Sequence, residues 1–263
     1  MATTSTPEPF LQLQGLSKSF GQLRAVDEVS FVVAQGSLTG LIGPNGAGKT
    51  TTFDLIAGVQ KCDAGRILFR GQAIEPLATH QIFRRGLART FQVPRPFPTM
   101  TVLENVLLAP LGQLGERFDA NWWAVSRVRA QERQLQERAH GVLQWCALAD
   151  KAGLLAGQLS GGQQKLLELA RVLMIDPQMI LLDEPAAGVN PSLLETLMER
   201  VQMLHQQGIT FLLIEHNMDL VMRMCQRVLV MAQGRLLADG SPREIQDNPK
   251  VLDAYLGPTP VVA

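Results

Sequence analysis

Residues 43–50 read Gly-Pro-Asn-Gly-Ala-Gly-Lys-Thr, a glycine-rich stretch that ends in lysine and threonine. The apolar run Leu38–Ile42 precedes it, and a helical pattern over residues 48–58 follows it. A strand, a glycine-rich turn and a helix in this order direct backbone N–H groups and a helix N-terminus at a phosphate. The sequence therefore predicts a phosphate-binding loop within an α/β core.

The composition restricts the classes of protein and partner. The chain has 263 residues, with 24 basic and 24 acidic side chains, which is enough for one large α/β domain or a core that carries a lobe. Because the charge is balanced, there is no global attraction for nucleic acid. Cys62, Cys146 and Cys225 lack the close spacings of zinc and redox motifs, so we expect isolated reduced thiols and no disulfide framework.

Two further features concern membranes and tails. Residues 1–9 lack the basic and apolar regions of a secretory signal, and we expect them to form a flexible tail. Every apolar run, Val102–Leu111 included, is interrupted by a charge, a proline or a glycine before it reaches the ~20 residues that a membrane span needs. Any association with a membrane is therefore expected to be peripheral.

The order of the predicted elements indicates the fold class. Short apolar runs at 10–14, 26–34 and 38–42, and a further strand at 63–71, make the N-terminal part rich in strands. From residue 161 onward, helices and strands alternate, which implies a parallel sheet covered on both faces. The predicted helices span 161–175, 191–207 and 217–225, and the predicted strands span 178–182, 209–214 and 227–231.

Between Pro94 and about Gly157 the sequence changes character. A proline-punctuated entry is followed by long helical stretches without a convincing strand, which we interpret as a helical lobe inserted in the core. Apolar residues from Trp122 to Cys146 recur at spacings of three, four or seven among many charges, as in an amphipathic surface helix. Since both charge signs are interspersed, packing on its own lobe is favoured over binding to a membrane surface.

Two adjacent carboxylates follow a buried-looking strand. The strand Met179–Leu182 delivers Asp183 and Glu184 to its C-terminal end, where open α/β sheets place their ligands. Asp183 is suited to hold Mg²⁺, directly or through water, and Glu184 to orient and deprotonate the water that attacks a γ-phosphate. The alternative is that the two carboxylates only cap an exposed turn.

A second candidate anion site begins at Leu159-Ser160-Gly161-Gly162-Gln163. This stretch opens a helix, so the Ser160 hydroxyl and the free backbone N–H groups of the first turn could bind phosphate. Taken alone, Ser160 is an ordinary N-cap residue. With two phosphate-binding helix ends per chain, two chains could sandwich each nucleotide between the lysine loop of one and the serine loop of the other. Hydrolysis would then depend on dimerisation.

These motifs, in this order and spacing, resemble the nucleotide-binding subunit of an ATP-binding-cassette (ABC) transporter over residues 10–257. The resemblance implies a RecA-like P-loop NTPase core with an N-terminal antiparallel β-subdomain and an α-helical subdomain inserted at about 94–165. Residues 1–9 and 258–263 would be tails. It also implies ATP and Mg²⁺ as cofactors.

The resemblance assigns roles to individual residues. Glu184, His216 and Lys49 are the expected catalytic residues, and Thr50, Gln92 and Asp183 the expected metal ligands. The expected nucleotide-binding residues are Phe20, Gly43, Pro44, Asn45, Gly46, Ala47, Gly48, Lys49, Thr50, Thr51, Gln92, Ser160, Gly161, Gly162 and Gln163.

The residues themselves support the assigned roles of His216, Gln92 and Phe20 to different degrees. His216 follows the apolar strand Ile209–Ile214 and so is expected at the same sheet edge as Asp183, although a lone histidine after a strand is more often a packing or surface residue. Gln92, as the loop that senses Mg²⁺ and couples to the membrane partner, rests mostly on the resemblance. Phe20 could stack on adenine, but a strand-end phenylalanine is equally suited to the core.

One departure points to a subgroup. Many cassette ATPases continue after Glu-Pro with Ser-Ala-Leu-Asp, whereas this chain has Ala186-Ala187-Gly188-Val189-Asn190, so a neutral amide replaces the acidic dimer contact. The stretch Glu184–Pro191 resembles ATPases of branched-chain amino-acid importers. Thr90-Phe91-Gln92 with 97–105, and the ending Ala254-Tyr255-Leu256-Gly257, suggest the same subgroup.

The resemblance therefore implies a peripheral ATPase on the cytoplasmic face of the inner membrane. It would power an importer of branched-chain amino acids, or its cargo could be urea, amides or, by export, lipopolysaccharide. The expected partners are a second cassette, identical or different, two membrane permeases and, indirectly, a periplasmic solute-binding protein. A soluble ATPase of DNA repair or translation is disfavoured because the sequence has no zinc spacing and no net positive charge. A regulatory subunit without turnover is disfavoured because Glu184 and His216 are both present.

Overall fold

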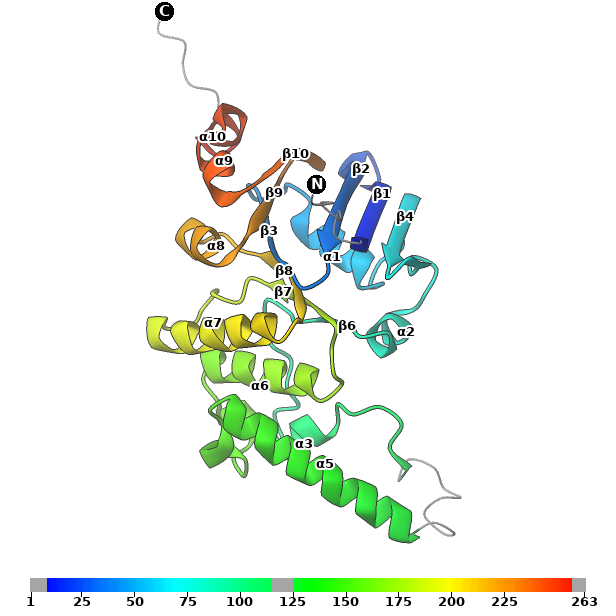
Figure 1. Cartoon of the computed structure of the whole chain (residues 1–263), viewed down its shortest axis with the longest axis vertical. Helices are drawn as coiled ribbons and strands as arrows, with labels where there is room; N and C mark the ends of the chain where they lie inside the picture. Colours follow the sequence, from blue (N-terminus) through cyan, green and yellow to red (C-terminus); the bar gives the residue numbers. More distant parts are fainter. Residues whose placement is uncertain (1–8, 115–124, 257–263) are drawn as a thin grey trace, which may run out of the picture. The chain divides into compact units, whose positions relative to one another are not determined.

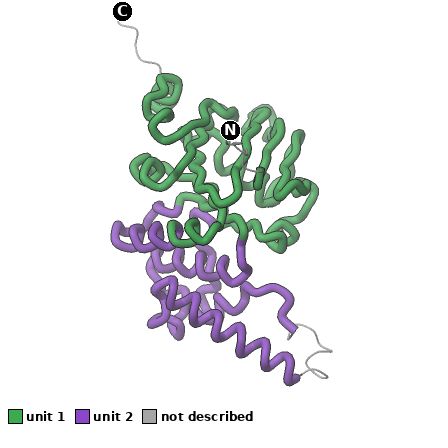
Figure 2. Tube along the Cα trace, in the orientation of Figure 1, with its two compact units in different colours: residues 1–89, 178–184, 202–263 green, residues 90–177, 185–201 purple. Residues whose placement is uncertain are grey.

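A computed structural model describes residues 9–114 and 125–256 of the chain. Residues 1–8 of the predicted tail 1–9, the predicted tail 258–263, the predicted helix start at Trp122 and the predicted domain end at Gly257 lie outside the described residues. Pro9, the last residue of the predicted N-terminal tail, instead begins the first strand. The chain divides into two compact units (Figure 2). Unit 1 takes its residues from 1–89, 178–184 and 202–263, and unit 2 consists of the described parts of 90–177 and 185–201.

Unit 1 contains two sheets (Figure 1). A four-stranded antiparallel sheet has the order β2-β1-β4-β5, and a six-stranded sheet has the order β10-β9-β3-β8-β7-β6. The first sheet consists of β1 (Pro9–Phe20), β2 (Leu23–Ala34), β4 (Ala64–Phe69) and β5 (Gln72–Ala73). The second consists of β3 (Leu38–Ile42), β6 (Leu87–Arg89), β7 (Met179–Asp183), β8 (Thr210–Ile214), β9 (Arg227–Ala232) and β10 (Arg235–Gly240).

Some helices of unit 1 connect these strands, and two follow the last strand. They are α1 (Lys49–Ile56), α2 (Thr79–Arg84), α8 (Met218–Met224), α9 (Pro242–Gln246), α10 (Pro249–Leu256) and the end of α7 (Pro191–Gln206). Every residue of β3, β7 and β8 is buried, as expected for parallel strands covered on both faces. One continuous core includes Leu11 of β1, Val29 of β2, Phe53 of α1 and Leu41 of β3. Helix α1 therefore packs with strands of both sheets.

The predicted parallel sheet is confirmed for β9-β3-β8-β7-β6. The sequence did not predict β6 and β10. Strand β6 has only three residues, too few for a pattern to emerge. Strand β10 is an antiparallel edge strand that is only half-buried along most of its length, so its apolar signal is weak.

Unit 2 is helical in its described residues (Figure 2). It contains α3 (Val102–Leu107), α5 (Val125–Trp145), α6 (Gly161–Leu173), the start of α7 and two short 3₁₀ turns at Ala149–Lys151 and Ala156–Gln158. Helix α5 contacts α3 and α6 and buries Val128, Ala139 and Leu143. Its apolar stripe thus packs within its own unit, as the spacing predicted. The limits 94–165 for the helical subdomain stay a prediction.

The described residues bear on two features, disulfide bonds and membrane-spanning helices. The three cysteines are free thiols, and burial raises the pKa of Cys146 and of Cys225 to about 12, so both remain protonated at neutral pH. Among helices within 9–114 and 125–256, none combines the length and the apolar character that crossing a membrane requires.

Candidate nucleotide-binding site

The glycine-rich loop leaves the buried strand β3 and enters α1. Gly43, Gly46 and Gly48 have φ values of +149°, +78° and +96°, a region that side chains with a Cβ rarely adopt. A Cβ at Gly43 would lie 2.1 Å from the Met231 carbonyl oxygen, and one at Gly48 would lie 2.2 Å from that of Ala25. The backbone at these two glycines is therefore packed directly against its neighbours.

We expect Gly43→Ala to lower the free energy of unfolding by at least about 1 kcal/mol more than Gly46→Ala. Both substitutions place a Cβ at positive φ, but only the one at Gly43 meets another atom, since nothing lies within 4 Å of a Cβ at Gly46. Thermal unfolding of the two variants measures the difference. Equal melting temperatures would show that the loop can shift away from Met231.

Lys49 lies inside this loop. Its Nζ donates to the Gly43 carbonyl oxygen at 2.7 Å and to the Pro44 carbonyl oxygen at 3.0 Å, and only 5% of the residue is exposed. Burial lowers the pKa of Lys49, while the charges of Glu184 and Asp183 raise it. The positively charged Lys49 ammonium therefore lies within the loop, near the two carboxylates. Thr50, in the first turn of α1, is exposed.

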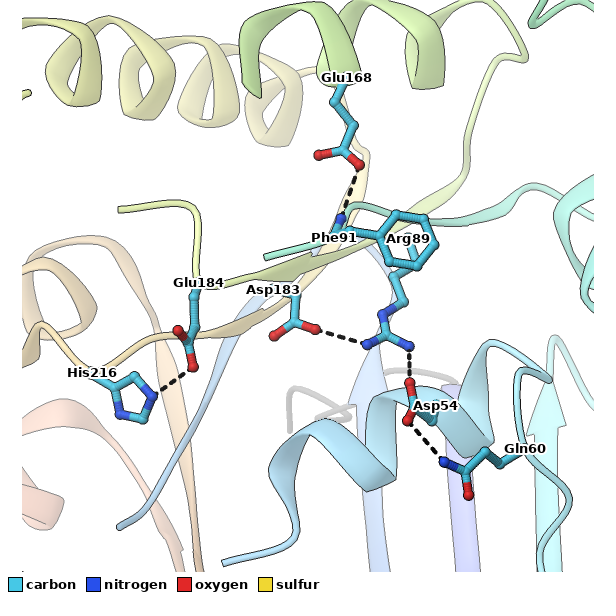
Figure 3. A network of polar contacts seen from close by, with 8 residues as sticks. All are labelled: Asp54, Gln60, Arg89, Phe91, Glu168, Asp183, Glu184 and His216. Carbon is cyan, nitrogen blue, oxygen red and sulfur yellow. Dashed lines mark hydrogen bonds and ion pairs between the residues drawn. The ribbon is translucent and has the colours of Figure 1, made fainter. Parts of the chain in front are cut away.

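Asp183 and Glu184 occupy the end of β7, as predicted. Asp183 is 3% exposed; burial raises its pKa above the ordinary value, and the hydrogen bond and charge of Arg89 oppose that rise. Glu184 has a φ of +47°, and its N–H donates to the Ile214 carbonyl oxygen of β8 at 2.9 Å. This turn directs the Glu184 side chain toward the second residue after β8 (Figure 3).

That residue is His216. Its Nε2 lies 2.6 Å from Oε1 of Glu184, and the two side chains face each other in Figure 3. Oε2 of Glu215 accepts hydrogen bonds from the backbone N–H groups of His216, at 3.0 Å, and Asn217, at 3.3 Å, which fixes the turn. The predicted position of His216 beside the carboxylates is thus observed, and its catalytic role stays a prediction.

The Ser160 loop belongs to unit 2. The Ser160 hydroxyl accepts from the Gln163 N–H at 3.4 Å, and Oε1 of Gln163 accepts from the Ser160 N–H at 3.0 Å, which forms a capping box at the start of α6. A Cβ on Gly162 would lie 2.9 Å from a Leu193 methyl carbon. Ser160 is therefore an N-cap residue within its chain, and phosphate binding across a dimer stays a prediction.

The two remaining predicted residues, Gln92 and Phe20, belong to different units. Gln92 is exposed in the irregular segment that begins unit 2, where the neighbouring Phe91 N–H donates to Oε1 of Glu168 at 3.0 Å. Phe20 ends β1 in unit 1 and is 46% exposed, with Nζ of Lys18 5.6 Å from its ring centroid. Its exposure argues against the core alternative. Unit 1 thus contains Phe20, the loop, both carboxylates and His216, while unit 2 contains Gln92 and the Ser160 loop.

Sequence reasoning missed Arg89 and Asp54. Arg89 Nη2 donates to Asp183 Oδ2 at 2.8 Å, and its Nη1 donates to Asp54 Oδ1 (Figure 3). One signal was available: Arg89 follows the buried residues Leu87 and Ala88, and an arginine that directly ends a buried strand needs a carboxylate partner.

Comparison with known proteins gives the family. The ABC transporter family matches residues 26–187, and a branched-chain amino acid ATP-binding cassette transporter segment matches 235–257. The chain is 43% identical to the probable branched-chain amino acid transport ATP-binding protein LivG of Archaeoglobus fulgidus, over 94% of this chain and 95% of the relative. It is 42% identical to BraF of Pseudomonas aeruginosa, a high-affinity branched-chain amino acid transport ATP-binding protein, and 41% identical to LivG of Escherichia coli K12, each over 95% of this chain and 98% of the relative.

Solved structures agree. A nucleotide-free ATP-binding cassette from an ABC transporter superposes with a TM-score of 0.81 at 37% identity, covering 95% of this chain and 99% of the other. The ADP conformation of a cassette superposes with a TM-score of 0.80 at 36% identity and the same coverage. The fold is thus a P-loop NTPase core with an antiparallel β-subdomain, and the chain belongs to the ABC transporter family as an ATP-binding cassette that hydrolyses ATP.

Proposed function

We propose that this chain is the ATPase subunit of an importer for branched-chain amino acids, at the cytoplasmic face of the inner membrane. The similarity to LivG and BraF, whose names state this transport, and the matched segment at 235–257 support the cargo class. The observation that carries the turnover is the contact between Glu184 and His216 at 2.6 Å, in the same unit as the phosphate loop.

The oxygen donors of the site fit Mg²⁺. Among the described residues there is no cluster of three or more histidine, cysteine, aspartate or glutamate side chains that could form a cage of protein ligands. Mg²⁺ is commonly bound by one or two protein oxygens together with substrate phosphates and water. The Asp183 carboxylate and the Thr50 hydroxyl of unit 1 are donors of this kind, and Gln92 of unit 2 stays a candidate ligand from the resemblance. When bound, the ion would neutralise charge on the β- and γ-phosphates.

The residues of the chain would divide the work of hydrolysis. The backbone N–H groups of residues 43–50 and the Lys49 ammonium bind the phosphates. Glu184 accepts a proton from water as the water oxygen bonds to the γ-phosphorus, and the bond from that phosphorus to the β–γ bridging oxygen breaks, which yields ADP and phosphate. His216 holds Glu184 in orientation and contacts the γ-phosphate.

Dimerisation would complete the site. In this proposal, Ser160–Gln163 of a second cassette, another copy or a different chain, bind the same nucleotide. Because the Ser160 hydroxyl is already engaged with the Gln163 N–H at 3.4 Å, the geometry of the helix start is fixed before the partner binds. ATP would close two cassettes over two nucleotides, and hydrolysis would reopen them.

An exposed apolar surface of unit 2 would bind the permeases. We define it as the docking surface, which consists of Phe91, Val93, Phe97, Leu154 and Leu155, each at least 40% exposed. Two separate segments of the chain form it.

Backbone bonds hold these two segments side by side. The Gly157 N–H donates to the Pro98 carbonyl oxygen at 3.1 Å, and the Ala156 N–H donates to that of Met100 at 2.9 Å. The buried amide of Asn105 bonds both the N–H and the carbonyl of Phe97, at 2.8 and 3.0 Å. A pre-formed apolar surface of this kind suits a short helix of a membrane partner.

We expect Phe97→Ser to lower the recovery of permeases by about tenfold or more when the chain is purified from native membranes, because exposed aromatics dominate interface energetics. Val59→Ser is the matched control, since Val59 is also exposed, at 51%, but lies in unit 1. ATP binding should be unchanged in both variants. Undiminished recovery of permeases with Phe97→Ser would contradict the assignment of the docking surface.

The recovered partners also test the cargo. Two hydrophobic permeases and a solute-binding protein that binds leucine would support the proposed function. A binding protein for urea or amides would change the cargo class, a lipopolysaccharide-handling partner would reverse the direction of transport, and recovery of only ribosomes or DNA would overturn the importer proposal.

A further inference from the structure

Arg89, the last residue of β6, connects two carboxylates from different elements of unit 1 (Figure 3). Its Nη2 donates to Oδ2 of Asp183 at the end of β7, at 2.8 Å, and its Nη1 donates to Oδ1 of Asp54 on α1. The Arg89 and Asp183 side chains are 8% and 4% exposed, and that of Asp54 is 20% exposed. One buried guanidinium is therefore shared by two carboxylates.

We propose that Arg89 is a positioning residue for the divalent cation of the ATPase reaction. It fixes the Asp183 carboxylate in one orientation and ties it to α1, the helix that carries Thr50. The inference rests on the proposed function, because it takes Asp183 and Thr50 as the cation ligands. In this role Arg89 touches neither nucleotide nor cation.

The guanidinium is held in place from a third side. Its Cζ lies 5.9 Å from the centroid of the Phe53 ring, and Phe53 is fully buried. A planar guanidinium offers donors in fixed directions, so it can span two carboxylates and still stack on an aromatic ring. A lysine ammonium is a point charge and cannot reproduce this geometry.

The second arm of Arg89 reaches the helix of the phosphate loop. Asp54 follows Thr50 by four residues in α1, which places the two side chains on the same helix face, one turn apart. Oδ2 of Asp54 accepts from Nε2 of Gln60 at 3.2 Å, so both oxygens of Asp54 have partners. Arg89 therefore connects one candidate ligand directly and the other through one turn of α1.

Charge and geometry predict opposite effects of losing Arg89. The three side chains Arg89, Asp54 and Asp183 sum to one negative charge, and without the guanidinium they would sum to two. If Arg89 acted only through charge, its removal would strengthen cation binding. If it positions Asp183, removal would weaken cation binding. Arg89→Lys keeps the charge and changes the geometry, so it isolates the second effect.

The test measures binding, with Mn²⁺ as the probe in place of Mg²⁺. Electron paramagnetic resonance of the full chain, with a non-hydrolysable ATP analogue, gives the Mn²⁺ affinity. We expect Arg89→Lys to weaken it by about 10- to 100-fold, the range found for residues that orient metal ligands. Binding of the analogue in EDTA should change by less than about twofold, since Arg89 does not contact the phosphates.

Arg227→Lys is the matched control. Arg227 of β9 also makes a two-pronged contact, from Nε and Nη2 to the carboxylate of Asp239 at 2.7 and 2.5 Å, but Asp239 lies on the edge strand β10. We expect this variant to keep the Mn²⁺ affinity of the unaltered chain. An unchanged or higher Mn²⁺ affinity in folded Arg89→Lys would overturn the inference.

Two further variants separate the possible failures. If Asp183→Asn keeps its Mn²⁺ affinity, the metal site of the proposed function is wrong. If Asp183→Asn loses affinity and Arg89→Lys does not, only the role of Arg89 is wrong. Should Arg89→Lys fail to fold, as judged by its melting transition, Asp54→Asn decides the question. We expect at least a threefold loss of Mn²⁺ affinity from that variant, and no loss would overturn the inference.

Discussion

Glu184→Gln is expected to lower the rate of ATP hydrolysis by about 10²- to 10⁴-fold, the usual contribution of a general base. Glutamine keeps the size of the side chain and can still contact His216, whose Nε2 lies 2.6 Å from Glu184 Oε1 in the unaltered chain. The glutamine amide cannot accept the proton of the attacking water. ATP binding should persist, because the phosphate loop is unaltered. Steady-state phosphate release and equilibrium binding of ATP measure the two effects separately.

Glu75→Gln is the control for this prediction. Glu75 is also half-buried in unit 1, and its Oε2 accepts from the Ile67 N–H at 3.2 Å, away from the loop. Its hydrolysis rate should stay within about twofold of that of the unaltered chain. If Glu184→Gln retained more than about a tenth of the rate, another group would have to take the proton, and the assignment of the base would be wrong.

Lys49→Ala is expected to weaken ATP binding by at least about 100-fold and to abolish turnover. Hydrogen bonds to charged groups contribute about 1.5–3 kcal/mol each, and the Lys49 ammonium is expected to contact both the β- and the γ-phosphate. The substitution also removes the donor that now bonds the Gly43 and Pro44 carbonyl oxygens at 2.7 and 3.0 Å. Fluorescence titration with a labelled ATP measures the affinity.

Lys61→Ala is the control for Lys49→Ala. It removes a lysine that bonds backbone carbonyl oxygens but is not expected to contact phosphate. The Lys61 Nζ also bonds two backbone carbonyl oxygens, those of Glu75 and Leu77 at 3.0 and 2.9 Å, but it lies outside the phosphate loop. We expect it to bind ATP normally. If Lys49→Ala kept its ATP affinity and its melting temperature, Lys49 would not be a phosphate ligand.

The sequence predicted those parts of the site that directly follow a strong local pattern. The phosphate loop continues from β3 and the carboxylates from β7, and all residues of both strands are buried. Such uniformly apolar runs are detectable without a structure, and parallel strands bring their carboxyl ends to one edge. His216, two residues after β8, could be placed beside Glu184 by the same argument.

The sequence indicated only part of the docking surface that we propose. The resemblance pointed to the loop at Gln92 as the contact with the membrane partner, but not to Leu154 and Leu155. These residues join that part of unit 2 through backbone bonds such as that from the Val102 N–H to the Leu154 carbonyl oxygen at 2.9 Å. These bonds link positions about 50 residues apart, so the spacing of residues within a short stretch of sequence cannot predict them.

By itself, the sequence determined which local elements form and which chemical groups each of them ends in, because backbone sterics, capping and apolar periodicity act over a few residues. The tertiary structure alone decided which groups meet. Arg89 contacts Asp54 at a separation of 35 residues and Asp183 at a separation of 94. The three-residue strand β6 owes its position to its pairing with β7 and carries too short a pattern to be predicted. A buried guanidinium and its carboxylates must pair to offset their desolvation, but only the packed sheet determines which carboxylates lie within reach.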